Sequence, residues 1–285
     1  MTQYIALIGY PLGHSISPLF QQAALDHLNL DVKYLAWEVA PEGLAGALER
    51  LRRPENLGAN ATIPYKEKVL PSLDRLEGQA REIGAVNTIA KEKGSLVGYN
   101  TDGQAFLQAL RENGGLEPRG RNVVLLGAGG AARALAFSLL RAGIRSLTIY
   151  NRGLKRARKL AGDLQEILAH GQGVQALPWE ERLSGLPPCQ LIVQATPLGT
   201  GEDSTSPLPA QLIPRGVLAY DLVYNPPETP FLKEAKKAGA RALGGLPMLV
   251  YQGAASFELW TGQNAPLEVM FQAAERVLKS SQGKV

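Results

Sequence analysis

Short apolar runs and amphipathic stretches alternate along most of the chain. Apolar runs bounded by glycine, proline or polar residues predict buried strands, and apolar positions spaced by three or four residues predict helices. Strands are expected over residues 4–9, 32–39, 60–63, 122–126, 146–150, 190–195 and 217–223, and a hairpin over residues 86–100. Helices are expected over residues 17–28, 41–51, 65–73, 75–83, 101–113, 129–142, 154–169, 248–261 and 266–279.

This alternation is typical of α/β proteins, in which a mostly parallel sheet is flanked by helices. A glycine-rich stretch over residues 114–120 interrupts it as a candidate linker, and a second strand–helix series begins directly afterwards. The helical segments after about residue 245 have no strand of their own, so we expect them to return and pack on the first domain. The predicted domains are residues 1–104 with 246–285, and residues 105–245.

Composition narrows the function classes. The chain has 285 residues with 45% hydrophobic and 20% charged content, as expected for a soluble globular protein of two domains. Its net charge of +4 suits anionic small ligands, and the sequence carries no basic–aromatic cluster typical of nucleic-acid binding. Cys189 is the only cysteine and the three histidines are scattered, so no metal site is expected. Without a signal peptide or a membrane-spanning apolar run, a cytoplasmic location is expected.

A glycine motif of the form G-x-G-x-x-A occupies residues 127–132, after an expected strand and before an expected helix. Gly127 permits the tight turn, Gly129 lets a pyrophosphate approach the backbone, and Ala132 lets the helix pack closely. The helix N-terminus then offers free N–H groups to the phosphates. A simple glycine turn is the alternative, but the strand–turn–helix context favours a Rossmann-type dinucleotide site. The contacts expected here are Gly127, Ala128, Gly129, Gly130 and Ala131.

The next strand ends at Asn151 and Arg152, and Lys155 and Arg156 follow one turn later. An NAD site usually has Asp or Glu at this place, where a carboxylate accepts from the ribose 2′-hydroxyl. A 2′-phosphate instead requires a planar cation with a second positive charge nearby. The sequence therefore favours NADP over NAD, and a solvated basic helix start is the alternative.

A third loop of the same series carries Thr196 and Pro197 after the strand expected over residues 190–195. Ligands in open α/β sheets bind at the carboxyl ends of the strands, where this loop is expected. Thr196 can form hydrogen bonds, and Pro197 can shape the turn beside a nicotinamide or its ribose. Taken alone the signal is weak, because strands often end in such a loop for structural reasons only.

Polar side chains also gather at the strand ends of the first domain. They are Ser15, Ser17, Thr62, Lys66, Asn87, Asn100, Thr101 and Asp102, and His14 is interpreted as a loop residue. Singly, each has a structural explanation: Ser17 and Thr101 as helix N-caps, Asp102 as a favourable charge at a helix start, and Lys66 as a solvated cation. Together these hydroxyl, amide, ammonium and carboxylate groups suit a polyhydroxylated carboxylic acid.

Seven ordered motifs resemble those of the shikimate dehydrogenase family and span nearly the whole chain. They are GHSISP (13–18), NATIPYK (60–66), AVNT (85–88), NTDG (100–103), NR (151–152), DLVYNP (221–226) and MLVYQ (248–252). The resemblance implies two α/β domains around a cleft, the second of Rossmann type, with the C-terminal helices returning to the first. It also implies reversible NADPH-dependent reduction of 3-dehydroshikimate to shikimate, in the biosynthesis of chorismate and the aromatic amino acids.

The resemblance further implies roles for individual residues. Lys66 and Asp102 correspond to the catalytic pair. The substrate-binding residues implied are Ser15, Ser17, Thr62, Asn87, Tyr224 and Gln252. Leu222 and Gly245 join the residues named above as cofactor contacts. The expected partners are shikimate or 3-dehydroshikimate and NADP(H), with no nucleic acid or membrane, in a monomer or homodimer.

Several positions depart from the family pattern. Ala61 stands where Val is usual, and Gln21 and Gln22 stand where a His-Asn pair is common. Gly153 replaces a Thr that could hydrogen-bond a phosphate, and Thr200 replaces a Met. The last two changes concern cofactor affinity and nicotinamide packing, and they leave the catalytic pair intact.

The implied reaction explains why one lysine stands after a proline at the end of a strand. Reducing a ketone requires hydride at carbon and a proton at oxygen, and the cofactor supplies only the hydride. As a hypothesis, the Lys66 ammonium hydrogen-bonds the carbonyl and protonates the developing alkoxide, and Asp102 positions Lys66 and favours its charge. Pro64 and a helix starting after it would hold Lys66 in place.

Three other functions compete with this interpretation. A dual quinate/shikimate dehydrogenase would accept a substrate with one more ring hydroxyl, and residues near Ser15 and Ser17 would discriminate. A folate-linked methylene dehydrogenase also uses a lysine, but the NTDG motif and Gln252 disfavour it. A non-catalytic NADP-sensing module would be expected to lack Lys66 or Asp102, and both are present.

Overall fold

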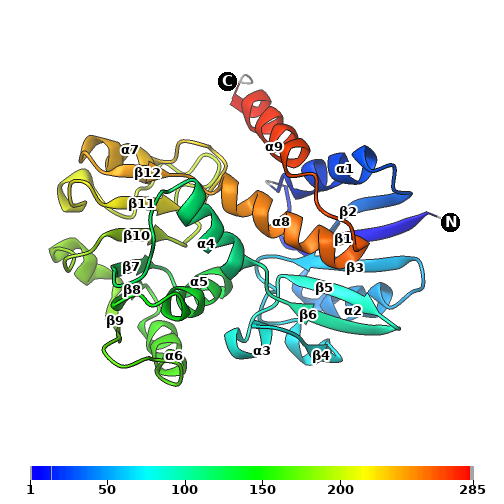
Figure 1. Ribbon diagram of the computed structural model, residues 1–285, viewed down its shortest axis with the longest axis horizontal. Coiled ribbons are helices and arrows are strands. Elements are labelled where there is room, and N and C mark those ends of the chain that lie inside the picture. The colour runs from blue at the N-terminus through cyan, green and yellow to red at the C-terminus, as the bar shows by residue number, and fades with distance from the viewer. Residues whose placement is uncertain (1, 14, 283–285) are drawn as a thin grey trace. The chain divides into compact units, whose positions relative to one another are not determined.

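The computed structural model describes residues 2–13 and 15–282, so His14 lies outside the described residues. The chain divides into two compact units, Met1–Ala105 with Leu249–Val285, and Phe106–Met248. Each unit contains a six-stranded sheet with helices packed on it (Figure 1). The α/β class is confirmed, and so is the return of the C-terminal helices to the first unit.

The first sheet has the order β2-β1-β3-β5-β6-β4. Its strands are β1 (Gln3–Gly9), β2 (Val32–Glu38), β3 (Asn56–Ala61), β4 (Arg75–Leu76), β5 (Thr88–Glu92) and β6 (Ser95–Tyr99). Both β2 and β3 run parallel to β1, one on each side of it. The chain thus leaves β1 and β3 at the same edge of the sheet, at the point where the strand order reverses and ligands commonly bind.

The helices of the first unit cover both faces of this sheet. They are α1 (Ser17–His27), α2 (Leu44–Leu51), α3 (Ala80–Ile83), α8 (Leu246–Thr261) and α9 (Leu267–Gln282), and α4 (Asp102–Glu112) begins in this unit. Because side chains alternate along a strand, Trp37 faces the core under α2, and Tyr34 faces Trp260 of α8 with ring centroids 6.1 Å apart. Figure 1 shows α9 beside α1, and these two helices contact each other.

The second sheet is parallel throughout and has the order β12-β11-β10-β7-β8-β9. Its strands are β7 (Asn122–Leu126), β8 (Ser146–Asn151), β9 (Gly173–Pro178), β10 (Leu191–Gln194), β11 (Leu218–Asp221) and β12 (Arg241–Leu243). Helices α5 (Gly130–Arg141), α6 (Leu154–Gln165) and α7 (Pro230–Lys237) complete the unit. The strand order reverses between β7 and β10, which confirms a Rossmann-type arrangement.

Two predicted helices are wrong. Between residues 65 and 73 the described helical structure is a 3-10 turn over Leu70–Ser72, because Pro71 lacks the N–H that a longer helix needs. The helix predicted over residues 75–83 is replaced by β4 and the short α3. The predicted third strand starts four residues earlier, at Asn56, and ends at Ala61, before Pro64. Strands β9 and β12 and helix α7 were not predicted.

The hairpin prediction is confirmed at its turn. Lys93 and Gly94 connect β5 and β6 with φ angles of 49° and 86°. Two successive residues with positive φ are typical of the tight turn that matches the twist of a hairpin. Residues 114–120 form an irregular connection between α4 and β7, and Leu116 in it is buried.

Candidate active site

The loops that follow β1 and β3 lie against each other. The backbone N–H of Tyr10 donates to the carbonyl of Ile63 at 3.0 Å, and that of Thr62 donates to Ile8 at 2.9 Å. A Cβ on Gly9 would lie 2.4 Å from Cγ2 of Thr62, so glycine is required for this close approach. The segment with Ser15 and the segment with Thr62 and Lys66 therefore leave the sheet side by side.

Lys66 is held by its neighbours in the fold, not by the helix that the sequence predicted. The ring of Tyr65 is fully buried, and its hydroxyl donates to the carbonyl of Val39 at 2.5 Å. The carbonyl of Lys66 itself accepts from the N–H of Val86 at 2.7 Å. A buried anchor before Lys66 and a backbone bond at Lys66 fix the origin of its long side chain.

Lys66 and Asp102 form a close ion pair. The Lys66 Nζ and Asp102 Oδ2 atoms are 2.5 Å apart, and the two side chains are 16% and 3% exposed. Asp102 is the first residue of α4, where the helix dipole favours a carboxylate. Its N–H also donates to Oδ1 of Asn100 at 3.1 Å. The structure thus presents a partly exposed ammonium group on a buried, fixed carboxylate.

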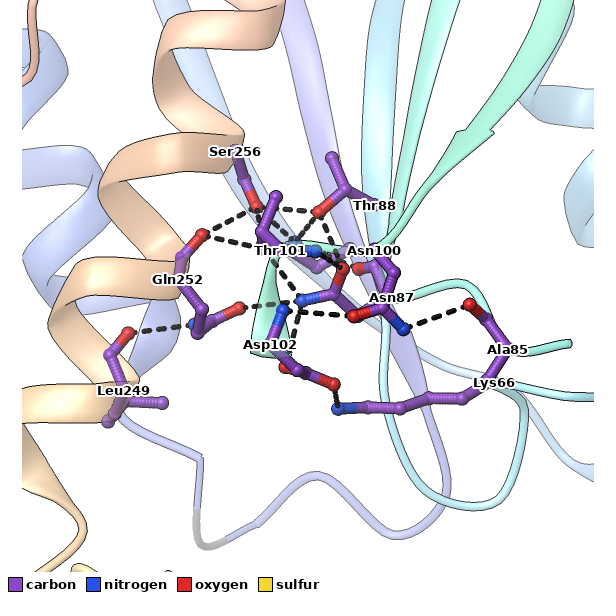
Figure 2. A network of polar contacts seen from close by, with 11 residues as sticks. Lys66, Ala85, Asn87, Thr88, Asn100, Thr101, Asp102, Leu249, Gln252 and Ser256 are labelled. Atoms are coloured by element: carbon purple, nitrogen blue, oxygen red, sulfur yellow. Dashed lines mark hydrogen bonds and ion pairs between the residues drawn. The ribbon is translucent and has the colours of Figure 1, made fainter. Parts of the chain in front are cut away.

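Asn87 connects this pair to helix α8 (Figure 2). Its Nδ2 donates to Oγ1 of Thr101 at 2.8 Å, to Oδ1 of Asp102 at 2.9 Å and to Oε1 of Gln252 at 3.2 Å. Its Oδ1 accepts from the N–H of Thr101 at 2.8 Å, which fixes the orientation of the amide. The Nε2 of Gln252 donates to the carbonyl of Leu249 at 2.8 Å. Lys66, Asn87, Asp102 and Gln252 therefore form one cluster.

A second layer of buried polar residues lies behind Asn87 and was missed in the sequence analysis. Asn60 donates from Nδ2 to the carbonyl of Asn87 at 3.0 Å and to the hydroxyls of Thr88 and Ser256 at 3.2 Å and 3.1 Å. Its Oδ1 accepts from the hydroxyl of Tyr34 at 2.7 Å, and burial raises the pKa of Tyr34. Asn60 is a polar residue between two alanines in a buried strand, which is a signal that the sequence carries. Ser256 lies one turn after Gln252 on α8 and has no local signal of its own.

The remaining predicted substrate residues of the first unit follow β1 and β3: Ser15 and Thr62 lie in the loops, and Ser17 starts helix α1. Ser17 is the first residue of α1 and is buried, but the N-cap of this helix is Ile16, without a side-chain bond. The prediction of Ser17 as an N-cap is therefore wrong, although Pro18 stands in the first turn as expected. The hydroxyl of Ser15 accepts from the N–H of Ser17 at 3.4 Å. Thr101 uses its hydroxyl to bond Asn87 and the carbonyl of Gln252.

The glycine loop of the second unit connects β7 to α5. Gly127 has a φ of +118°, and a Cβ there would lie 2.9 Å from the carbonyl oxygen of Ala195. Gly129 precedes the first residue of α5, and among the described residues nothing lies within 4 Å of a Cβ built on it. Gly130 and Ala131 form the first turn of α5, and Ala128 lies in the turn before Gly129. This turn leaves room for a phosphate beside a helix N-terminus, so it fits a dinucleotide.

The four residues predicted to select NADP cluster at the end of β8. Asn151 ends the strand, and its Nδ2 donates to the carbonyl of Gly153 at 3.0 Å. Arg152 follows directly, and Lys155 and Arg156 lie in the first turn of α6; all three are exposed. Because β8 pairs with β7, these cations stand at the same sheet edge as the glycine loop.

Thr196 and Pro197 follow β10, and the buried Gln194 organises their loop. Oε1 of Gln194 accepts from the N–H and the hydroxyl of Thr196 at 3.0 Å and 2.9 Å. Its Nε2 donates to the carbonyls of Thr196 and Leu198. The hydroxyl hydrogen of Thr196 is thus used inside its own loop, and the role of Gln194 was not predicted from the sequence.

Leu222, Tyr224 and Gly245 come together in the loops after β11 and β12. A Cβ on Gly245 would lie 2.2 Å from the carbonyl oxygen of Leu222, and the N–H of Gly245 donates to the carbonyl of Val223 at 3.2 Å. Tyr224 is half-buried in the loop after β11. This loop is closed by Asp221, whose carboxylate accepts from the N–H of Val223 at 3.0 Å and from the hydroxyl of Thr229 at 2.6 Å.

Burial dominates the electrostatics of Asp221. Desolvation raises the pKa of its carboxyl to about 7, although the bonds from Thr229 and Val223 favour the charged form. Burial also raises the pKa of the Cys189 thiol to about 11, which makes that thiol a poor nucleophile at neutral pH. No group of three or more His, Cys, Asp or Glu residues that could hold a metal occurs in the described part of the chain. Within that part, no helix is both long and apolar enough to cross a membrane.

Comparison with known proteins places this site in a family. Residues 7–89 match "Shikimate dehydrogenase substrate binding domain", residues 109–196 match "Shikimate / quinate 5-dehydrogenase", and residues 245–275 match "Shikimate 5'-dehydrogenase C-terminal domain". The chain is 43% identical over 273 residues to the shikimate dehydrogenase (NADP(+)) of Desulforamulus reducens, covering 94% of this chain and 93% of that protein. The chain belongs to the shikimate dehydrogenase family.

Two further members of the shikimate dehydrogenase family are similar over nearly the whole length. The shikimate dehydrogenase (NADP(+)) of Methanopyrus kandleri is 45% identical over 274 residues, which cover 95% of this chain and 94% of that protein. The crystal structure of shikimate 5-dehydrogenase from Thermus thermophilus, in complex with NADP(H) and shikimate, has a TM-score of 0.85 and 41% identity. That comparison covers 97% of this chain and 100% of the other. The family resemblance read from the sequence motifs is confirmed.

Proposed function

We propose that this protein is an NADP-dependent shikimate dehydrogenase, which reversibly reduces 3-dehydroshikimate to shikimate in chorismate and aromatic amino acid biosynthesis. One observation carries the proposal: the Lys66–Asp102 pair lies in a cluster with Asn87 and Gln252, in a chain of the shikimate dehydrogenase family. The curated relatives compared above are named as NADP(+)-dependent shikimate dehydrogenases.

The first unit supplies the groups that a polyhydroxylated carboxylic acid requires. Lys66 offers an ammonium group with 16% of its side chain exposed, and Asn87 and Gln252 offer amides beside it. We assign Ser15, Ser17 and Thr62 to the carboxylate and hydroxyls of the same substrate. Their loops leave adjacent parallel strands at one sheet edge, which brings the hydroxyls toward a common ligand.

Lys66 transfers the proton of the reaction, and Asp102 positions Lys66. In the reducing direction the Lys66 ammonium donates a hydrogen bond to the ketone oxygen and then gives up a proton as that oxygen becomes negative. In the oxidising direction the neutral amine takes the proton from the hydroxyl. Asp102 keeps Lys66 aimed and balances its charge, and Asn87 holds the other carboxylate oxygen at 2.9 Å. Bound NADPH would supply the hydride to the carbonyl carbon.

The second unit fits the dinucleotide. The space beside Gly129 and the start of α5 suit the pyrophosphate, and Gly127, Ala128, Gly130 and Ala131 shape that turn. We assign the 2′-phosphate to Arg152 with Asn151, Lys155 and Arg156, because planar guanidinium and ammonium groups bind phosphate well. The loops with Thr196, Pro197, Leu222 and Gly245 are assigned to the nicotinamide end, and Tyr224 to the substrate.

The test is a set of initial rates of cofactor reduction with shikimate and with quinate, each with NADP and with NAD. We expect fast turnover with shikimate and NADP alone. Comparable rates with quinate or NAD would assign the chain to the dual-specificity branch of its family. Nucleotide binding without turnover of either substrate would contradict the proposal and support an NADP-sensing module. The cytoplasmic location and the monomeric or homodimeric state stay predictions from the sequence.

A further inference from the structure

Ser256 closes a ring of hydrogen bonds around the site. Asn87 donates to the hydroxyl of Thr101 at 2.8 Å, and Thr101 donates to the backbone carbonyl of Gln252 at 3.0 Å. The hydroxyl of Ser256 lies 2.8 Å from that carbonyl and 2.6 Å from the hydroxyl of Thr88, which lies 3.1 Å from Oδ1 of Asn87. The ring starts and ends at Asn87, and Ser256 is its link between α8 and β5 (Figure 2).

We propose that Ser256 is a positioning residue, which sets the orientation of the Asn87 amide for the substrate and, through the bond from Asn87 to Oε1 of Gln252, that of the Gln252 amide. The inference rests on the proposed function, because it assumes that these two amides meet shikimate. Ser256 is fully buried and lies beyond Asn87 and Thr88 in the network, so it acts through them. Ser256 can contact the same group of residues as Gln252 because it lies one turn after Gln252, on the same face of α8.

The donor count explains why the hydroxyl matters. Ser256 and Thr88 each have one hydroxyl hydrogen, and Asn60 also donates to both oxygens, at 3.1 Å and 3.2 Å. If Ser256 donates to Gln252, Thr88 donates to Ser256; if Ser256 donates to Thr88, Thr88 donates to Oδ1 of Asn87. In either arrangement, the buried hydroxyls of Ser256 on α8 and Thr88 on β5 both have hydrogen-bond partners. An alanine at 256 would leave Asn60 and Thr88 with one partner fewer in a place that water does not reach.

Helix α8 provides a matched control. Thr261 lies five residues after Ser256 and donates to the carbonyl of Phe257 at 2.8 Å, as Ser256 can to Gln252. The other partner of Thr261 is the N–H of Gln263, so both partners belong to its own segment. Ser256→Ala and Thr261→Ala therefore remove the same local bond, and only the first also removes a link to β3 and β5.

The experiment compares steady-state kinetics of the wild type, Ser256→Ala and Thr261→Ala, with shikimate and with NADP as the varied substrate. We expect Ser256→Ala to raise the KM for shikimate about tenfold, the effect of about one lost hydrogen bond, and to leave the KM for NADP unchanged. Thr261→Ala should change neither constant. An unchanged KM for shikimate in Ser256→Ala would overturn the inference, and so would an equal rise in Thr261→Ala. A fall in kcat with both KM values unchanged would do the same, because a smaller amount of folded enzyme lowers kcat without changing either KM.

A second variant and a second readout keep the inference testable if Ser256→Ala folds poorly. Thr88→Val keeps the shape of Thr88 and removes its hydroxyl, so it should raise the KM for shikimate similarly, and the double variant should add little. Additive effects would contradict a shared ring. In ¹⁵N NMR spectra the side-chain amide signals of Asn87 and Gln252 should shift in Ser256→Ala and stay in place in Thr261→Ala. Unshifted signals would overturn the inference without any assay of turnover, whereas an inactive wild type would count against the proposed function instead.

Discussion

The two sheet edges of this protein are built in opposite ways. In the first unit, side chains from a strand, a loop and two helices meet in a buried network. Within it, the single side chain of Asn87 contacts three residues, Thr101, Asp102 and Gln252. In the second unit, backbone segments approach one another at glycines, as where a Cβ on Gly127 would lie 2.9 Å from Ala195. The first edge depends on hydrogen-bonding side chains, and the second depends on glycines that have no Cβ atom.

This difference follows from what each edge is proposed to bind. A small polyhydroxylated acid is recognised by hydrogen-bonding side chains fixed in direction, and fixing them requires a second layer such as Asn60 and Ser256. A dinucleotide phosphate is bound by backbone N–H groups and a helix N-terminus, which require close backbone approach. Removing a side chain should therefore harm the first edge most, and adding one should harm the second most.

The largest effect is expected from removing the cation of the first edge. Lys66→Ala should lower kcat about 1,000-fold, because the variant lacks the proton donor, while NADPH binding changes little. Stopped-flow absorbance measures turnover, and fluorescence titration measures NADPH binding. Lys68→Ala, which removes an exposed lysine two residues away, is the control and should keep wild-type rates. Turnover near the wild-type value in Lys66→Ala would remove Lys66 from the mechanism.

The next effect tests the second edge by addition. Gly127→Ala should weaken NADP binding and destabilise the fold by about 2 kcal/mol, because alanine is strained at a φ of +118° and its Cβ would press on Ala195. The control is Gly162→Ala inside α6, where the described residues leave open space and alanine favours the helix by about 1 kcal/mol. Calorimetric titration with NADP and thermal unfolding measure both changes. If Gly127→Ala bound NADP as tightly as the control, the close approach would not matter for the cofactor.

The glycine turn of the second edge is marked more directly in the sequence than the network of the first edge, because the turn is local and the network is not. Glycine at a strand–helix junction is a local signal, and residues 127–132 carry it within one stretch. The network of the first edge joins Asn60, Asn87 and Ser256, which are distant in sequence, and only the fold brings them together. The resemblance of the motifs supplied the first-layer residues, but nothing local distinguished Ser256 from an ordinary helix serine.

The errors in the fold have equally local causes. The pattern of residues 65–73 predicts a helix, but Pro71 limits it to a 3-10 turn. Tertiary hydrogen bonds hold the segment instead: Tyr65 donates to Val39, and Lys66 accepts from Val86. Strand β12, with three residues, is too short to show a periodic pattern. Its place is fixed by pairing with β11 in the folded sheet.

Asp221 tests whether the second edge also depends on a buried side chain. The pKa of the Asp221 carboxyl is about 7 in the folded protein, above its ordinary value. As the pH rises from about 4 to about 7, the unfolded chain therefore loses this proton before the folded protein does, and the free energy of unfolding should fall. Asp221→Asn should remove that trend, which amounts to about 2 kcal/mol between pH 5 and pH 7. Thermal unfolding across this pH range measures the difference. Glu228→Gln, at an exposed carboxyl in the same loop, should keep the wild-type trend. An identical trend in Asp221→Asn would show that the carboxyl titrates normally.

The smallest effect concerns the exposed cations at the second edge. Arg152→Ala should weaken NADP binding about tenfold and leave NAD binding unchanged, since only the 2′-phosphate distinguishes the two cofactors. The loss is limited because Lys155 and Arg156 stand one turn further along α6 and still attract the phosphate. Raising the salt concentration should reduce the difference between wild type and variant, because exposed charges are screened. Arg158→Ala, in the next turn of α6, is the control and should change neither affinity. Equal losses for NADP and NAD in Arg152→Ala would mean that Arg152 supports the loop itself, and the second edge would then depend on a side chain in the same way as the first.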